Sequence, residues 1–197
     1  MKQLLFLFIS LLFIGCSQEV PPVKQYRLNV EIPEVPVKSS VCKDRSLKIL
    51  SPSATYEYTT NKFYYVQGLE EATYTQSNWA RTPVNDIYYL ILNNIRRSNI
   101  FGTVENYTSI VKGDLNLEIE IQNFKQYFSK NADESYVIVN ITLTLINKKH
   151  FKVISQQNFY KKVPTPSADA KGGVEAFNKA LKELIPEMID WLDGSCQ

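Results

Sequence analysis

Cys16 is the residue whose neighbours point most clearly to chemistry. It follows Gly15 at the end of an apolar segment, residues 4–14, which contains a single polar residue, and Lys2 supplies a positive charge before that segment. A positive tip, an apolar core of about ten residues and a small residue before the break are typical of a secretory signal that is later removed. We therefore predict a signal peptide over residues 1–15, with cleavage between Gly15 and Cys16.

A signal that is cut immediately before a cysteine resembles a bacterial lipobox, although Phe13 stands where a lipobox favours leucine. In that class of signal the thiol receives a diacylglyceryl group, and the lipidated cysteine becomes the first residue of the mature chain. Acyl chains, palmitate among them, would hold Cys16 on a membrane, at about 0.8 kcal/mol per buried methylene. The alternatives are an ordinary signal peptide and an uncleaved membrane anchor, but a spanning helix needs about 20 apolar residues.

The other two cysteines, Cys42 and Cys196, offer a second kind of thiol chemistry. An exported protein meets oxidising conditions, in which an even pair of thiols favours a disulfide. The bridge would close a loop of about 155 residues, which the loop-entropy model values at roughly 5 kcal/mol at most. Its role would be structural, since redox motifs place their two sulfurs much closer in sequence. The alternative is two unpaired thiols.

Other residue combinations do not favour catalysis. The only histidine, His150, lies beside two lysines in a predicted turn, where no partner is positioned for a triad or a metal site. Glu118 and Glu120 share one face of a predicted strand, which is more typical of a solvated surface than of a carboxylate pair. The chain has no G-x-S-x-G, phosphate-loop or dinucleotide motif. We expect a non-enzymatic protein without a cofactor or a metal.

The charge balance argues against nucleic acid as a partner. Of the 22 Lys and Arg residues, 21 remain once Lys2 is removed with the signal, against 20 Asp and Glu. A nearly neutral chain lacks the basic footprint of a nucleic-acid-binding protein.

Apolar spacing of three and four predicts two helices. The first begins with Thr82 as its cap and Pro83 in its first turn, and it ends near Asn99. The second is expected over residues 174–192, since Gly172 and Gly173 disfavour an earlier start. Pro186 should kink or break it near residues 182–185.

Alternation with a period of two predicts the strands. Residues 115–122 and 137–146 should form an antiparallel hairpin, with a third long strand over 151–163. Shorter strands are expected at residues 26–32, 47–50, 63–66 and 103–107. The fold class is α/β: a mixed, mostly antiparallel sheet with two main helices packed on one face. We expect one domain over residues 25–197, joined to the lipid by a tether of residues 16–24.

An aromatic segment between residues 56 and 79 could form a docking face. Aromatic side chains combine a large contact area with a polar tip, as interfaces and membrane-surface belts require. The alternative is that alternate members fill the core. The candidate docking residues are Tyr56, Tyr58, Tyr64, Tyr74 and Trp79.

The order of these parts resembles the ABC-type transport auxiliary lipoproteins, a bacterial family that includes the lipoprotein of the paraquat-inducible intermembrane transport system. The resemblance covers residues 24–193 and rests on the order and spacing of short motifs, whereas Cys42 and Cys196 depart from the pattern. The matching residues are Cys16, Tyr26-Arg27-Leu28, Asn78-Trp79-Ala80, Asn123-Phe124, Phe159 to Pro164, and Val174 to Leu181.

This resemblance implies a lipoprotein of the bacterial cell envelope, anchored to the outer membrane and facing the periplasm. Its partners would be a periplasmic MCE-domain protein and an ABC permease and ATPase, and its system would move phospholipid between membranes. Two alternatives stay open. One is a carrier that binds lipid in an apolar cavity between helices and sheet. The other is a structural or assembly lipoprotein for a lipopolysaccharide translocon or a secretion machine.

Overall fold

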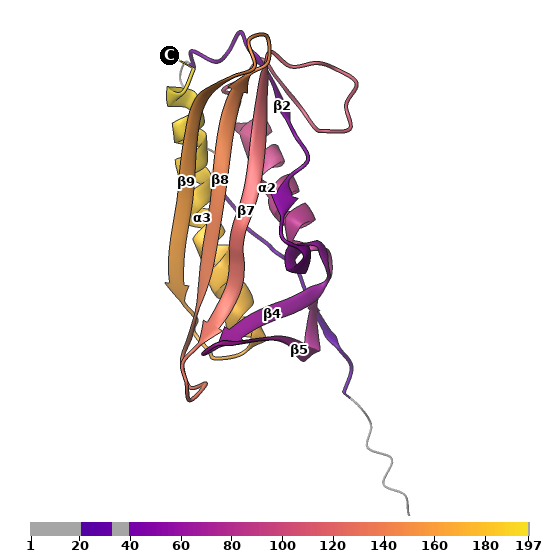
Figure 1. Ribbon diagram of the computed structural model, residues 1–197, viewed down its shortest axis with the longest axis vertical. Coiled ribbons are helices and arrows are strands. Elements are labelled where there is room, and N and C mark those ends of the chain that lie inside the picture. The colour runs from indigo at the N-terminus through magenta and orange to yellow at the C-terminus, as the bar shows by residue number, and fades with distance from the viewer. Residues whose placement is uncertain (1–20, 33–39, 197) are drawn as a thin grey trace, which may run out of the picture.

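A curled mixed sheet of nine strands carries two long helices on one of its faces (Figure 1). The computed structural model describes residues 21–32 and 40–196. Gly15, Cys16 and the predicted signal peptide lie outside the described residues, as does most of the tether. The strands are β1 (Lys24–Tyr26), β2 (Ser46–Ile49), β3 (Ser53–Ala54), β4 (Lys62–Gln67), β5 (Glu70–Trp79), β6 (Thr103–Glu105), β7 (Leu115–Phe128), β8 (Ser135–Asn147) and β9 (Lys152–Pro164).

The longest strands form the antiparallel ladder β7–β8–β9, with β9 at the edge of the sheet, as the alternating pattern predicted. Strand β7 buries every second residue along its first half, and β8 buries nearly all of its inward side chains. The other edge of β7 pairs in parallel with β2, β3 and β4 in turn. Five of the eight strand pairings are parallel, but the two longest are antiparallel.

Helix α2 (Pro83–Ser98) has the predicted ends, Thr82 and Asn99, and Asn99 adopts the left-handed conformation as C-cap. The Thr82 side chain, however, accepts no capping hydrogen bond, so the predicted capping contact does not form. Helix α3 (Ala170–Gly194) begins earlier than predicted. The Asp169 carboxylate accepts a hydrogen bond from the Gly172 N–H at 2.7 Å, and this cap starts the helix before the glycines. The helix continues through Pro186 as a single element, so the predicted break does not form.

The predicted strand at residues 26–32 is wrong, because only Lys24–Tyr26 pairs with β5. Strand β5 ends at Trp79, so the chain after Tyr26 has no strand to continue along. It crosses α3 instead, where the Asn29 N–H donates to the Asn178 side chain at 2.9 Å. The predicted alternation still holds as a burial pattern that ends in buried Ile32.

One hydrophobic core joins the helices to the inner face of the sheet. At its centre the rings of Phe124 and Phe177 stack 3.9 Å apart, next to Trp79. The predicted Cys42–Cys196 disulfide is present and links the segment before β2 to the end of α3. Because both long helices and the long strands contribute to this core, the chain after the tether contains the parts that the fold needs.

Candidate docking surface

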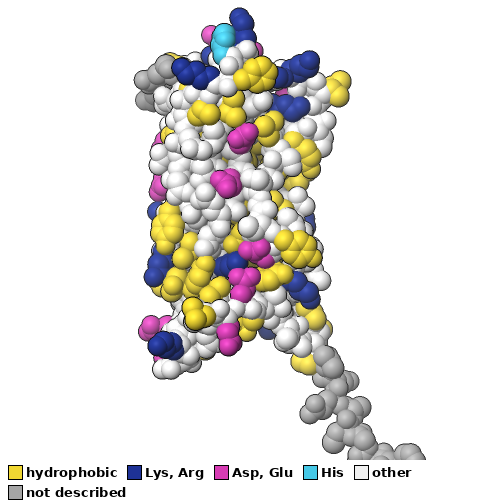
Figure 2. All heavy atoms as spheres, in the orientation of Figure 1, with side chains coloured by type: hydrophobic (Ala, Val, Ile, Leu, Met, Phe, Trp, Pro, Cys, Tyr) yellow, Lys and Arg dark blue, Asp and Glu magenta, His cyan; other side chains and the backbone are white. Residues whose placement is uncertain are grey.

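The outer face of the β7–β9 ladder is open, because both helices lie on the opposite side (Figure 1). The half of this face near the β7–β8 turn carries a group of aromatic and apolar side chains that we call the outer patch. Figure 2 shows hydrophobic side chains gathered on this half. The outer patch consists of Tyr127, Tyr136, Ile138 and Tyr160, together with the basic residue Lys162.

Strand register brings the members of the outer patch together. Tyr127 lies opposite Tyr136, and their rings stack with centroids 5.4 Å apart. The Lys162 ammonium lies 3.7 Å from the centroid of the Tyr136 ring, within the range of a cation–π contact. Tyr160 is exposed on β9. The outer patch therefore presents aromatic faces from three strands with one positive charge beside them.

A pocket of about 410 Å³ adjoins the outer patch at the β7–β8 turn. It shares Tyr136 and Lys162 with the patch and has Phe128 and Pro164 as further apolar walls. An apolar side chain of a partner could enter this pocket while the rest of the partner lies on the patch.

The other half of the same face is polar. Here the Asn158 side-chain amide lies within hydrogen-bond distance of Gln122, Asn140 and Thr142. Glu118 and Glu120 are exposed on the same face. These side chains are arranged for contact with water, and the exposed apolar residues Val153 and Ile154 lie beyond them at the start of β9. The aromatic contact area on the ladder is therefore confined to the outer patch.

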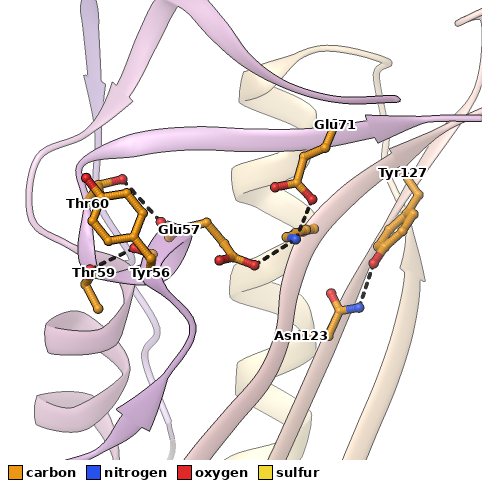
Figure 3. Close-up of polar contacts among 8 residues, drawn as sticks. Tyr56, Glu57, Thr59, Thr60, Glu71, Asn123 and Tyr127 are labelled. Carbon is orange, nitrogen blue, oxygen red and sulfur yellow. Dashed lines mark hydrogen bonds and ion pairs between the residues drawn. The ribbon is translucent and has the colours of Figure 1, made fainter. Parts of the chain in front are cut away.

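Lys125 connects the ladder to the short 3-10 helix η2 (Tyr56–Thr59). Its ammonium lies 2.9 Å from a Glu57 carboxylate oxygen and 2.6 Å from one of Glu71, so residues from β7, η2 and β5 meet at one cation (Figure 3). Burial of the ammonium opposes its charge, but its hydrogen bonds to Glu71 and Glu57 outweigh burial and raise the pKa of Lys125. The contact holds η2 in place beside the outer patch.

Two further contacts order the same region. The Asn123 side-chain amide donates to the Tyr127 hydroxyl at 2.6 Å, which fixes one ring of the outer patch (Figure 3). The Thr59 hydroxyl donates to the Tyr56 carbonyl at 2.7 Å within η2. Tyr56 itself is 77% exposed, so η2 presents an aromatic ring to solvent from a fixed backbone.

The five aromatic residues predicted as a docking face do not form one surface. Tyr58 and Trp79 are buried, and burial raises the pKa of Tyr58 to about 12. Tyr64 and Tyr74 are half-buried, and the Tyr74 hydroxyl donates to Gln126 at 3.0 Å. This part of the prediction is wrong because Trp79 packs against Phe177 of α3 and Tyr58 is buried where η2 meets β7. Tyr56 is the exposed member.

The outer patch was missed by the sequence analysis. The alternation identified which face of β7 is wet, but the tyrosines on that face belong to three strands that the sequence separates. Tyr127 and Tyr160 become neighbours of Tyr136 only through the register of β7, β8 and β9. The signal that could have identified the outer patch is that each of these three strands has a tyrosine on its solvent-facing side.

His150 lies exposed in the β8–β9 turn, with the side chains of its neighbours in solvent. Within residues 21–32 and 40–196, no three His, Cys, Asp or Glu side chains lie close enough to bind a metal ion together. No helix in this part of the chain is long and apolar enough to cross a membrane.

Comparison with solved structures identifies proteins of the same fold. Protein XCC0632 from Xanthomonas campestris, described by the family model DUF330, superposes with a TM-score of 0.78 and 17% identity over 88% of this chain and 96% of that one. This chain shares its fold. A second crystal structure, of an uncharacterized protein, gives a TM-score of 0.66 with 10% identity over 87% of this chain and 99% of that chain.

A third structure, of the hypothetical protein CT253 from Chlamydia trachomatis, gives a TM-score of 0.50 with 8% identity over 78% of this chain and 98% of that chain. At such identities the likeness shows the fold alone. Models of known protein families gave no match to the sequence, and a search of curated proteins gave none.

Proposed function

We propose that this chain is a lipid-anchored, non-enzymatic accessory subunit of an ABC-type, MCE-associated system that transports phospholipid between the two membranes of a bacterial envelope. The observation that carries the proposal is the outer patch, an uncovered aromatic surface on a rigid ladder, at the end of the fold where β1 lies (Figure 1). The patch would bind the periplasmic MCE-domain partner.

The length of the tether supports this assignment. Strand β1 begins at Lys24, and eight peptide steps separate it from Cys16. An extended chain of that length reaches at most about 28 Å. Acylation of Cys16 would therefore hold the outer patch close to a bilayer, where a subunit of a membrane-bound transport complex must work.

The interior of the fold favours docking over carriage of lipid. Aromatic side chains of β4, β5, β7 and α3 fill the space between the sheet and the helix, with Phe63 4.5 Å from Trp79 by ring centroids. Phe177 contacts both Phe124 and Trp79. A carrier would need this space for acyl chains, so the outer surface is the better candidate for contact with a partner.

Photo-crosslinking tests the proposal in envelopes that contain the candidate MCE-domain protein. A photoreactive amino acid is placed at Tyr160 in the outer patch, and at Gln156 on the polar half of the same strand as the control. We expect adducts with the MCE-domain protein from position 160 and none from position 156, and we expect Cys16→Ser to abolish them because the anchor is lost.

Three results would reject the proposal. Equal adducts from both positions would show that contact with the MCE-domain protein does not depend on the outer patch. Unchanged adducts in Cys16→Ser would show that it does not depend on the anchor. Adducts from position 160 with a lipopolysaccharide or secretion component would instead assign the chain to an assembly role.

A further inference from the structure

Basic side chains gather at the end of the molecule opposite the tether. The sequence segments that meet there are residues 40–46, 106–114 and 147–152, which we call the distal end. Four of its basic residues line a shallow pocket of about 420 Å³. The Lys148 N–H donates to the Asp114 carbonyl at 3.1 Å, which ties two of the three segments together. The lining basic residues are Arg45, Lys112, Lys148 and Lys149.

The positive charge of the distal end is largely unneutralised. Its three segments contain six Lys or Arg residues and two Asp residues, whereas the whole chain has a net charge of only +2. No ion pair within the described ranges involves any of the six. The Asp114 carboxylate accepts hydrogen bonds from the Ser46 hydroxyl and backbone N–H, which lower its pKa. Its hydrogen bonds therefore go to Ser46, while the side chains of Lys112, Lys149 and Lys152 are exposed to solvent.

Large apolar side chains project beside these charges. Ile110 is 97% exposed and Phe151 is 89% exposed, on two different turns of the distal end. Phe151 also has a backbone φ of 50°, in the left-handed region that is unfavourable for a bulky residue. The fold thus gains no burial from this ring. Figure 2 shows Lys and Arg side chains around exposed hydrophobic ones at this end.

The loop that carries Ile110 is held in a defined conformation. The Asn106 side-chain oxygen accepts hydrogen bonds from the backbone N–H groups of Thr108 and Ser109 at 3.1 and 2.9 Å. The Lys48 ammonium donates to the Ser109 carbonyl at 2.7 Å. Since the loop is already ordered, little conformational entropy is lost when its apolar tip enters another phase.

We propose that the distal end binds a membrane surface rich in anionic phospholipid. Phe151 and Ile110 enter the headgroup region, and the lysines around them contact lipid phosphates, as in other interfacial sites that combine apolar and basic side chains. An acidic protein would match the charge, but Ile110 and Phe151 project almost fully exposed from separate turns, whereas a stable protein interface needs one continuous, well-packed area. A bilayer surface adapts to both tips.

The inference is independent of the proposed function, because it requires neither Cys16 acylation nor an MCE-domain partner. If both hold, the protein contacts two lipid surfaces. The 14 residues of β7 set the two ends of the ladder about 45 Å apart.

Vesicle cosedimentation of the chain from Ser17 to Gln197 tests the inference, since this chain contains the core but no lipid. Vesicles are made of phosphatidylcholine with or without phosphatidylglycerol. We expect binding to the vesicles that contain phosphatidylglycerol, weakening with salt. Each lysine near an anionic surface contributes about fivefold to partitioning. The double variant Lys148→Glu/Lys149→Glu should therefore lose at least about twenty-fivefold, and Phe151→Ser about tenfold.

Matched variants separate a local site from net charge and surface hydrophobicity. Lys179→Glu/Lys182→Glu changes the charge equally on exposed positions of α3, and Leu69→Ser removes a fully exposed leucine from the β4–β5 turn. Both should bind vesicles as the wild type does. The inference is overturned if the wild type does not bind, if it binds phosphatidylcholine equally well, or if the controls lose as much as the distal variants.

Discussion

Among single residues, Lys125 has the contact on which the placement of η2 depends. Its side chain is 13% exposed, and its ammonium pairs with two carboxylates, those of Glu57 and Glu71. Lys125→Met keeps the aliphatic stem but leaves the two carboxylates together without a cation. We expect the free energy of unfolding at neutral pH to fall by about 1–3 kcal/mol. Urea denaturation measures the change.

Acid pH provides the matching test. Burial of Glu57 opposes its charge, but its hydrogen bond to Lys125 and further hydrogen bonds outweigh burial and lower the pKa of Glu57 below its ordinary 4.5. Its stabilising contribution is therefore present above pH 4.5 and is lost as the pH falls through the folded-state pKa. The difference between wild type and Lys125→Met should shrink under acid conditions. A constant difference would contradict the ion-pair account.

Lys161→Met is the control for this prediction. Lys161 also meets two carboxylates, Glu183 and Glu187, but at distances of 3.1 and 3.3 Å on a more exposed site. Surface pairs of this kind contribute up to about 1 kcal/mol. We expect a smaller loss of stability than in Lys125→Met.

The aromatic residues show what residue type alone can predict. An abundance of tyrosine between residues 56 and 79 correctly indicated large contact areas, but the type does not say whether the contact is with the core or with solvent. Tyr58 and Tyr56 lie two residues apart on η2, yet one is buried and the other exposed. That choice depends on how η2 sits on β7, which involves Lys125 from a distant part of the sequence.

Among the elements, α3 depends on close packing at its first turn. A Cβ atom on Gly172 would collide with the backbone of Ser167, which cannot move as a side-chain end can. Gly172→Ala should lower the free energy of unfolding by about 2–3 kcal/mol through overpacking. Gly194, at the other end of α3, has no atom within 4 Å of its Cβ position. Gly194→Ala should be neutral or gain up to about 1 kcal/mol.

Thermal and urea unfolding of the two variants gives the comparison. Equal effects at the two ends would mean that the loss comes from helix propensity, not from the contact with Ser167. The same contact explains why the sequence misplaced the start of α3. Two adjacent glycines normally weaken a helix, but here Gly172 admits the loop that carries the Asp169 cap and Gly173 admits the Gln126 side chain of β7.

Elements with strong periodicity were predictable, and those fixed by distant contacts were not. The β7–β8 hairpin and α2 have patterns that local geometry alone explains. Strand β5 was missed because Glu70, Glu71 and Gln76 interrupt any apolar alternation. Its pairing with β4 and β1 provides the hydrogen bonds that define it. The predicted strand at residues 26–32 was wrong for the converse reason. Its alternation is typical of a strand, but the described part of the chain has no neighbouring strand for it to pair with.

At the scale of the whole molecule, the ladder separates two surfaces of different chemistry. The outer patch is aromatic and lies near the tether, whereas the distal end is basic and carries isolated apolar tips. A single rigid sheet holds both, so their distance is fixed by strand length. The disulfide closes the distal end by joining the segment before β2 to the end of α3.

The Cys42–Cys196 bridge links residues 154 apart, so it constrains most of the unfolded chain. Cys42→Ala/Cys196→Ala should lower the free energy of unfolding by about 2–5 kcal/mol, because the unlinked chain gains loop entropy on unfolding. Urea denaturation with and without reductant measures this. Reductant should destabilise the wild type by a similar amount and leave the double variant unchanged. Because the bridge acts mainly on the unfolded chain, the reduced protein should retain vesicle binding; loss of binding on reduction would instead make the bridge part of the distal site.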